Sequence, residues 1–324
     1  MKIISSSNKV VELINLQPKT EDIQKIVVNG LSKLPKQLPA WFLYDEQGSI
    51  LFEKICEQPE YKITRTEINL LNYHSKSISN YIGNGIVVEF GAGNAEKVKS
   101  IIKVNSTLEY LALDISYEHL RKSLKRLKED FPNTNCIGIC CDHSQLNSLP
   151  KHPLINSKKL TGFFPGSSIG NYEYHESVKL LIKFREILKG GRLLIGIDHP
   201  KEASKLESAY NDSCGVSSEF AFNLLKRLNK ELGADFNINN FNYKAEWQAN
   251  ESQVEMSLQS KSDHIVSIKG YSWLFKSGEK LITENSIKYS MRQFRNLARE
   301  AGWEIIKTWN DQLEKYSLIL LDTA

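Results

Sequence analysis

The chain lacks any apolar run near the roughly 20 residues that a membrane-spanning helix requires. Its start, MKIISSSNKVVEL, also lacks the long apolar segment and the small-residue cleavage site of a secretory signal peptide. We therefore expect a cytoplasmic protein with no membrane partner. Cysteine is scarce as well, with five among 324 residues. This excludes a disulfide scaffold and predicts free thiols.

The spacing of these cysteines gives little indication of a metal site. The one suggestive cluster consists of Cys136, Cys140, Cys141 and His143. Isoleucines alternate with the thiols in the manner of a buried strand, and no second Cys-x-x-Cys pair completes a zinc site. We favour core thiols and expect no metal.

The chain also has little excess of charge of either sign, because 42 Lys and Arg residues nearly balance 38 Asp and Glu residues and leave a net charge of +4. The densest basic run, 121–128, contains leucines at helical spacing and is typical of a solvated helix face rather than a phosphate-binding patch. We expect no nucleic-acid partner. The composition is that of a globular protein, and the length predicts one large domain with an insertion, or two domains.

Short apolar runs alternate with helical patterns through the middle of the chain. They predict strands at 86–90, 110–113, 136–141, 160–164 and 192–197. Strands that alternate with helices indicate an α/β fold with a doubly wound parallel sheet. A helix at 292–301 and strands at 303–309 and 316–321 predict a terminal antiparallel strand pair.

The rhythm breaks after His199, where a helical stretch is followed by alternating strands. We predict an inserted α+β substrate-recognition domain at 200–284, to which the N-terminal helical segment 1–60 contributes. Residues 61–199 and 285–324 form the predicted cofactor-binding domain. The insertion starts at the carboxyl end of a strand, where ligands bind in open α/β sheets.

A glycine motif, VVEFGAGNAEK, follows the first strand of this sheet at 87–97. Two glycines permit a tight turn and the close approach of a ligand, although an ordinary turn has the same composition. A dinucleotide fingerprint needs a third small residue where this chain has Glu96, which disfavours an NAD-dependent dehydrogenase. Asp114, at the end of the second strand, can accept both ribose hydroxyls. The combination favours S-adenosylmethionine (SAM).

Two further strand ends carry polar residues. Asp142 follows the third strand, where its carboxylate can accept an adenine amino group or cap a helix N-terminus; both interpretations stay open. The loop FFPGSSIGN at 163–171 has more turn residues than a plain connection needs, and we interpret it as functional.

Six separated motifs give the chain a more specific resemblance. They read YDEQGSILFEKI, PEYKITRTE, EFGAGNAEKV, FFPGSSIGN, ESAYNDSCGVSSEF and ITENSIKYS. In this order they resemble the histidine N-alpha-methyltransferase family of ergothioneine biosynthesis, from about Trp41 onward. The resemblance implies a class I SAM-methyltransferase fold with a Rossmann-like sheet.

The family's residue roles carry over to matching positions of this chain. The resemblance implies cofactor binding by Tyr44, Gly91, Lys97, Asp114 and Asp142. It implies substrate binding by Tyr61, Asn171, Tyr210, Met256, Glu284 and Ser286. Tyr61, Asn171 and Phe52 would carry catalysis, with Phe52 walling the space of methyl transfer.

The chain departs from the family pattern at three positions. Lys62 and Ile63 stand where a second tyrosine and often a proline occur, at the substrate entrance. His143 stands where an aromatic residue is common, in the adenine pocket. These departures bear on substrate identity more than on reaction type.

The implied activity is successive methylation of the α-amine of L-histidine to the trimethyl betaine hercynine, with S-adenosylhomocysteine (SAH) as coproduct. We expect a monomer that acts on a small amino acid. Two alternatives remain: an N-methyltransferase for tyrosine or a tryptophan derivative, and a catalytically silent sensor that binds SAM or an amino acid.

Overall fold

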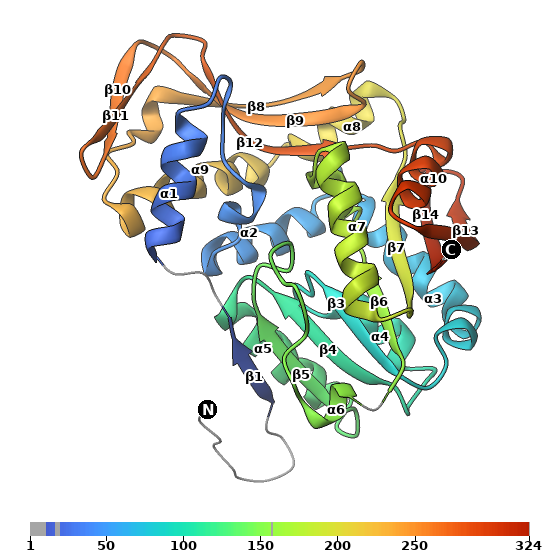
Figure 1. Ribbon diagram of the computed structural model, residues 1–324. Coiled ribbons are helices and arrows are strands. Elements are labelled where there is room, and N and C mark those ends of the chain that lie inside the picture. Colours follow the sequence, from blue (N-terminus) through green and yellow to red (C-terminus); the bar gives the residue numbers. More distant parts are fainter. Residues whose placement is uncertain (1–10, 17–19, 157, 324) are drawn as a thin grey trace. The chain divides into compact units, whose positions relative to one another are not determined.

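A computed structural model describes residues 11–16, 20–156 and 158–323 of the chain (Figure 1). Contacts between residues divide the chain into two units. Unit 1 comprises Met1–Gln17, Ile63–Pro200 and Lys288–Ala324, and unit 2 comprises Pro18–Lys62 and Lys201–Ile287.

Unit 1 is built on an eight-stranded sheet in the order β1-β5-β4-β3-β6-β7-β14-β13. The strands are β1 (Glu12–Asn15), β3 (Ile86–Phe90), β4 (Glu109–Asp114), β5 (Cys136–Cys140), β6 (Leu160–Phe164), β7 (Arg192–Asp198), β13 (Trp303–Asp311) and β14 (Tyr316–Thr323). The strands from β1 to β7 pair in parallel, whereas β14 is antiparallel to both β7 and β13. The predicted parallel sheet with a terminal antiparallel pair is confirmed, and β1 is an addition that the pattern did not predict.

The order of the strands fixes where a ligand can bind in unit 1. From β3 the chain proceeds to β4 and β5 on one side, and then returns to β6 and β7 on the other side of β3. Such a switch point opens a crevice at the carboxyl ends of the two central strands. The glycine motif leaves β3 at this edge, and the FFPGSSIGN loop leaves β6 beside it.

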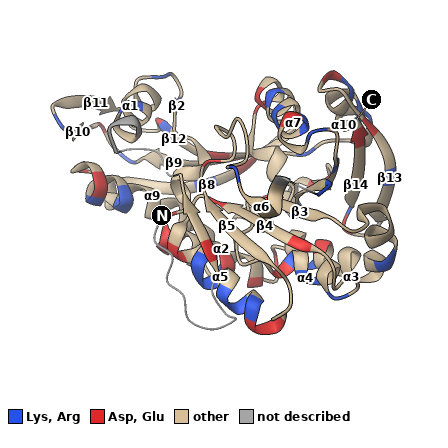
Figure 2. Cartoon of the chain, turned by 60° about the horizontal axis from the view of Figure 1, so that its bottom comes forward, with Lys and Arg blue, Asp and Glu red and all other residues tan. Residues whose placement is uncertain are grey.

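Helices complete unit 1, and their apolar stripes follow the sequence pattern. They are α3 (Ile63–Ile82), α4 (Glu96–Ile102), α5 (Tyr117–Asp130), α6 (Pro153–Asn156), α7 (Tyr174–Leu188), α10 (Met291–Glu300) and the 3-10 helix η2 (Ser168–Asn171). On α5, Leu120 and Leu124 are buried while Arg121 and Lys122 are exposed, and Figure 2 shows the charges along this helix. The predicted solvated basic face is confirmed.

Unit 2 contains a four-stranded sheet in the order β2-β12-β9-β8 and a separate β10-β11 hairpin. The strands are β2 (Lys36–Gln37), β8 (Phe241–Gln248), β9 (Gln253–Ser260), β10 (His264–Ile268), β11 (Tyr271–Phe275) and β12 (Lys280–Ile287). The helices are α1 (Thr20–Leu31), α2 (Glu46–Glu57), α8 (Ala203–Tyr210), α9 (Val216–Leu232) and the 3-10 helices η1 (Ala40–Leu43) and η3 (Ile238–Asn240). Helix α2 packs on α9, and α8 and α9 both contact β8 and β9.

Two expected absences can be compared with the described part of the chain. No helix there is both long enough and apolar enough to cross a membrane. No group of His, Cys, Asp and Glu within those residues is arranged to hold a metal ion. Cys140 and Cys141 are free buried thiols at the end of β5.

A buried ion pair joins the two points at which the chain leaves and re-enters unit 1. Lys288 Nζ lies 3.0 Å from Asp198 Oδ2, and the two side chains are 0% and 1% exposed. Burial of both charges costs desolvation energy, and each charge relies on its partner to offset that cost.

Lys288→Met is therefore expected to lower the free energy of unfolding by about 3–5 kcal/mol, because it leaves the Asp198 carboxylate buried without its counter-charge. The loss of unfolding free energy in the Lys288→Met/Asp198→Asn double variant should be smaller than the sum of the losses in the two single variants. Urea unfolding of the four proteins measures both effects. A loss below about 1 kcal/mol for Lys288→Met would contradict the expectation.

Candidate functional site

The glycine turn after β3 leaves an open patch of backbone. Gly91 and Gly93 have φ angles of +77° and +55°, in the left-handed region that side chains disfavour. A Cβ atom built on Gly93 would meet no atom within 4 Å, and one on Gly91 would meet only His143, at 3.9 Å. A ligand can therefore approach this backbone closely.

Asp114 is fixed beside this turn by two backbone donors. Its Oδ2 accepts the Gly93 N–H at 2.8 Å, and its Oδ1 accepts the Ser116 N–H at 2.9 Å. Each carboxylate oxygen has two lone pairs, so both oxygens can still accept a hydroxyl. These two acceptors fit the hydroxyl donors of a ribose diol, and thereby the nucleoside part of SAM.

Asp142 caps a turn rather than a helix. Its Oδ1 accepts the Ser144 N–H at 2.9 Å and the Ser144 hydroxyl at 2.6 Å. The next helix, α6, begins only at Pro153, so the helix N-cap interpretation is wrong. The turn fixes the carboxylate at the carboxyl end of β5.

His143, the departure from the family pattern next to Asp142, packs as an aromatic ring. Its centroid lies 6.2 Å from that of Phe90 and 5.6 Å from that of Phe164. Burial lowers its pKa, so the imidazole is neutral at physiological pH. The position keeps an aromatic character despite the change in residue type.

Two serines stabilise the FFPGSSIGN loop, Ser167 by a bond to the sheet and Ser168 by a bond within the loop. Ser167 adopts the left-handed region with φ of +57°, and its Oγ accepts the Asp198 N–H at 2.9 Å. Ser168 Oγ donates to the Pro165 carbonyl at 2.8 Å. Asn171 ends η2 in this loop and is half-buried.

Lys97, on α4, forms an ion pair with Glu67 at 2.8 Å.

Unit 2 carries the remaining site candidates, several of which form one aromatic cluster. Phe52 lies 5.5 Å from Tyr44 and 6.2 Å from Tyr61 between ring centroids, and Tyr61 lies 5.9 Å from Tyr210. Phe220 completes the cluster at 5.2 Å from Tyr44. Tyr44 is thus placed among the substrate candidates of unit 2, whereas the other four cofactor candidates belong to unit 1.

Two hydroxyl groups at the edge of this cluster form hydrogen bonds with Tyr210. Tyr210 Oη lies 2.8 Å from Ser286 Oγ, and the Tyr243 hydroxyl donates to the Tyr210 carbonyl at 2.7 Å. Burial raises the pKa of Tyr61 and of Tyr243 well above the usual tyrosine value, and the Glu284 charge adds to both shifts. These phenols are neutral near pH 7, where Tyr61 can donate a hydrogen bond.

A β-bulge sets the direction of Glu284. The β12–β9 register shifts between Ile282 and Glu284, so that Glu284 lies opposite Met256 instead of Glu255. The extra residue, Thr283, donates its hydroxyl to the Met256 carbonyl at 3.0 Å. Glu284, 9% exposed, and Met256 therefore share one face of the sheet, and the bulge avoids a like-charge pair.

Three residues of these clusters were not among the sequence candidates: Tyr243, Phe220 and Glu67. Tyr243 belongs to the alternating series Phe241, Tyr243 and Trp247 on β8, so its strand could have been inferred but its hydroxyl partner could not. Glu67 stands within the PEYKITRTE motif, which gave no reason to single it out.

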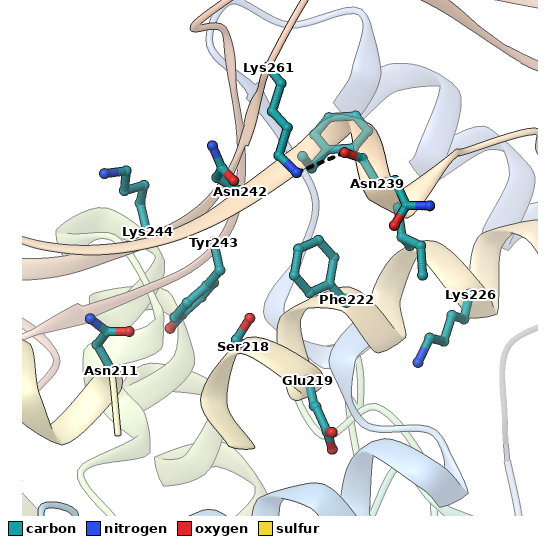
Figure 3. Close-up of a pocket in the computed structure, with 12 residues that line it drawn as sticks. Asn211, Ser218, Glu219, Phe222, Lys226, Asn239, Asn242, Tyr243, Lys244 and Lys261 are labelled. Atoms are coloured by element: carbon teal, nitrogen blue, oxygen red, sulfur yellow. Dashed lines mark hydrogen bonds between the residues drawn. The ribbon is translucent and has the colours of Figure 1, made fainter. Parts of the chain in front are cut away.

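A separate hollow of about 580 Å³ opens in unit 2 between α9 and β8 (Figure 3). Phe222 and Tyr243 line it, and Lys226, Lys244 and Lys261 bring positive charge to it. None of the sequence-predicted site residues lines this hollow, although Tyr243, which donates to the Tyr210 carbonyl, borders it.

Next to the glycine turn, β3 carries a buried acid. The Glu89 carboxyl group accepts a hydrogen bond from the Tyr110 hydroxyl at 2.6 Å, and both side chains are buried. Burial raises the pKa of Glu89 to about 8, against the opposing effects of Tyr110 and Lys97. The group is therefore mainly protonated at neutral pH.

A family model and the curated relatives of the chain indicate the same protein family. A family model described as "Histidine-specific methyltransferase, SAM-dependent" matches residues 23–323. The chain is 30% identical over 307 residues to a histidine N-alpha-methyltransferase of Mycolicibacterium smegmatis, covering 93% of this chain and 94% of that protein.

Fungal proteins are similar over most of the chain as well. Ergothioneine biosynthesis protein 1 of Neurospora crassa is 29% identical over 89% of this chain, which spans 33% of the fungal protein. The N-methyltransferase imqF of Aspergillus flavus is 25% identical over 94% of this chain and 86% of its own length.

The raised pKa of Glu89 predicts a pH dependence of stability. The folded chain holds a proton that the unfolded chain releases above its ordinary pKa of 4.5. The stabilisation by the neutral form is thus lost as pH rises toward about 8, by at most about 1.4 kcal/mol per pH unit.

Glu89→Gln keeps an acceptor for Tyr110 and removes the ionisation, so its unfolding free energy should exceed that of the wild type increasingly with pH. Urea unfolding between about pH 5 and about pH 9 measures the difference. Parallel pH profiles for the two proteins would contradict the assignment.

Proposed function

Because the chain belongs to the SAM-dependent, histidine-specific methyltransferase family, we propose that it methylates the α-amine of L-histidine successively to the trimethyl betaine hercynine. The observation that carries this proposal is the placement of Glu284 and Ser286 on one strand of unit 2. Ser286 is held by Tyr210, and the Glu284 charge acts on Tyr61 within the aromatic cluster.

Glu284 supplies the preference for histidine. A poorly exposed carboxylate gains a charge-assisted hydrogen bond from an imidazole N–H, which a phenylalanine ring lacks. A substrate without that donor would leave the carboxylate desolvated and unpaired, which penalises its binding. Ser286 can accept or donate a second bond at the ring.

Unit 1 would hold the cofactor in this proposal, through Gly91, Lys97, Asp114 and Asp142, and Tyr44 stays a further cofactor candidate. SAM supplies an electrophilic methyl group on its sulfonium. Asp114 would accept the two ribose hydroxyls at the open glycine backbone, and Asp142 the adenine amino group. Unit 2, with its aromatic cluster, would serve substrate recognition.

Positioning supplies most of the rate acceleration for such an in-line displacement. Each transfer forms one N–C bond and breaks one S–C bond, and the proton of the ammonium leaves to solvent beforehand. Tyr61 and Asn171 would orient the substrate's amine and carboxylate, with Tyr61 acting as a neutral donor because burial raises its pKa. The Phe52 ring would face the growing methylammonium, which its π-face attracts.

A second candidate function is N-methylation of another aromatic amino acid, such as tyrosine or a tryptophan derivative. Lys62 and Ile63 at the substrate entrance support it, as does the similarity to imqF. The silent sensor would bind ligands and form no product. We propose a cytoplasmic monomer for each of these activities.

The substrate assignment is tested by incubating the purified chain with SAM and each amino acid, with mass spectrometry of the products. Histidine should gain 14, 28 and finally 42 mass units, roughly, one CH₂ for each transfer. Faster turnover of tyrosine or tryptophan derivatives would replace the histidine assignment. Binding without product would indicate the sensor.

Glu284→Gln should raise the KM for histidine by about 10- to 100-fold, because it removes the charge of a hydrogen bond worth about 1.5–3 kcal/mol. Steady-state kinetics at saturating SAM measure this change. Glu251→Gln, at an exposed turn of the β8–β9 hairpin, is the matched control and should leave KM unchanged. An unaltered KM in Glu284→Gln would place the imidazole elsewhere.

Asp114→Asn should weaken SAH binding by at least about tenfold, because the amide places an N–H₂ group against backbone donors and loses the charge. Titration calorimetry measures the affinity. Asp130→Asn, at the exposed end of α5, should bind SAH as the wild type does. Equal affinities for all three proteins would refute the ribose contact.

A further inference from the structure

Glu67 is a fully buried carboxylate in unit 1 that no role assigned above explains. It lies on α3 and is 0% exposed. The Gly166 N–H donates to its Oε2 at 2.8 Å and to its Oε1 at 3.1 Å, and the Tyr316 hydroxyl donates to Oε1 at 2.7 Å. Lys97 Nζ lies 2.8 Å from Oε2. One carboxylate thus connects α3, α4, β14 and the loop after β6.

The space for this carboxylate is created by glycines. A Cβ atom built on Gly196 of β7 would overlap both Glu67 Oε1 and Tyr316 Oη. A Cβ atom on Gly166, where φ is +80°, would lie 3.0 Å from Lys97 Nζ. The sheet and the loop therefore leave room for the Glu67–Lys97 pair that no other residue type would provide.

Burial of the Glu67 carboxylate costs desolvation energy, which an apolar side chain at the same place would not require. A buried ion pair is often no more stabilising than apolar residues of similar volume. The orientation of the Glu67 carboxylate is nevertheless fixed. It accepts hydrogen bonds from Gly166 and Tyr316, pairs with Lys97 and has no contact with solvent. The carboxylate thereby holds the Lys97 ammonium at a defined place beside Gly166.

We propose that Glu67 is a positioning residue that aligns Lys97 with the carboxylate of the cofactor's amino-acid portion. This inference rests on the proposed SAM-dependent function. SAM carries two cationic groups, the sulfonium and the ammonium, and one anionic group, so a lysine attracts only its carboxylate. Glu67 also offsets the charge by which Lys97 would repel the two cationic groups.

The test compares two nucleosides that differ in the part Lys97 would contact. SAH has the amino-acid portion, and 5′-methylthioadenosine lacks it. Titration calorimetry on wild type, Glu67→Gln, Lys97→Met and the double variant gives the affinities. Glu67→Gln should weaken SAH binding at least about tenfold and change methylthioadenosine binding less than about twofold. In the Lys97→Met background, Glu67→Gln should weaken SAH binding little further.

Equal weakening of both nucleosides would overturn the inference, because a residue that only supports the fold affects every ligand alike. Unchanged SAH affinity would overturn it too. Failure of the wild type to bind either nucleoside would instead refute the proposed function. Asp322→Asn, which removes a carboxylate from the Arg192 pair of the same unit, is the control and should bind both as the wild type does.

Tyr316→Phe serves if Glu67→Gln does not fold, because it removes one donor to Glu67 and keeps every charge. It should weaken SAH binding by about threefold and spare methylthioadenosine. A loss shared by both nucleosides in this variant would again overturn the positioning role.

Discussion

Parallel pairing in the sheet of unit 1 is the constraint on which the rest of that unit depends. Hydrogen bonding in parallel register brings the carboxyl ends of β3, β4, β5, β6 and β7 to one edge. The residues of β3, β4 and β6 are all buried, as expected for strands covered on both faces. The side chains that follow the strands can therefore meet at that edge, whereas their positions in the chain are far apart.

Buried ionisable groups fix details of unit 1. Glu67, the Asp198–Lys288 pair and Glu89 each lose solvation, and each has specific donors or remains protonated. Satisfied polar networks of this kind rigidify a structure, because any displacement leaves a desolvated group without a partner. The loop at Gly166 is held in this way by Glu67, whereas the Asp114 carboxylate is held by the backbone N–H groups of Gly93 and Ser116.

Unit 2 uses a different device, an irregular antiparallel sheet. The bulge at Thr283 turns Glu284 to the face of Met256, and the Tyr210 hydroxyl, whose own backbone carbonyl is bonded by Tyr243, fixes Ser286. The charge of Glu284 acts on the neutral phenols of Tyr61 and Tyr243, and the Phe52 ring packs against Tyr61. Such an arrangement suits a small cationic amine with an aromatic head, which is the chemical class that the proposed substrate and product share.

The sequence by itself determined the strand–helix alternation, the terminal strand pair and the family, because periodicity and short motifs are local properties of a chain. Only the tertiary structure decided which residues are partners. Glu67 and Tyr316 are 249 positions apart, and neither residue's surroundings carry a local sign of the other. The turn at Asp142, the pairing of β1 and the bulge before Glu284 had no signature either. Burial follows a period that a single segment reveals, whereas a hydrogen-bond partner is chosen by the packing of segments that meet only in the folded chain.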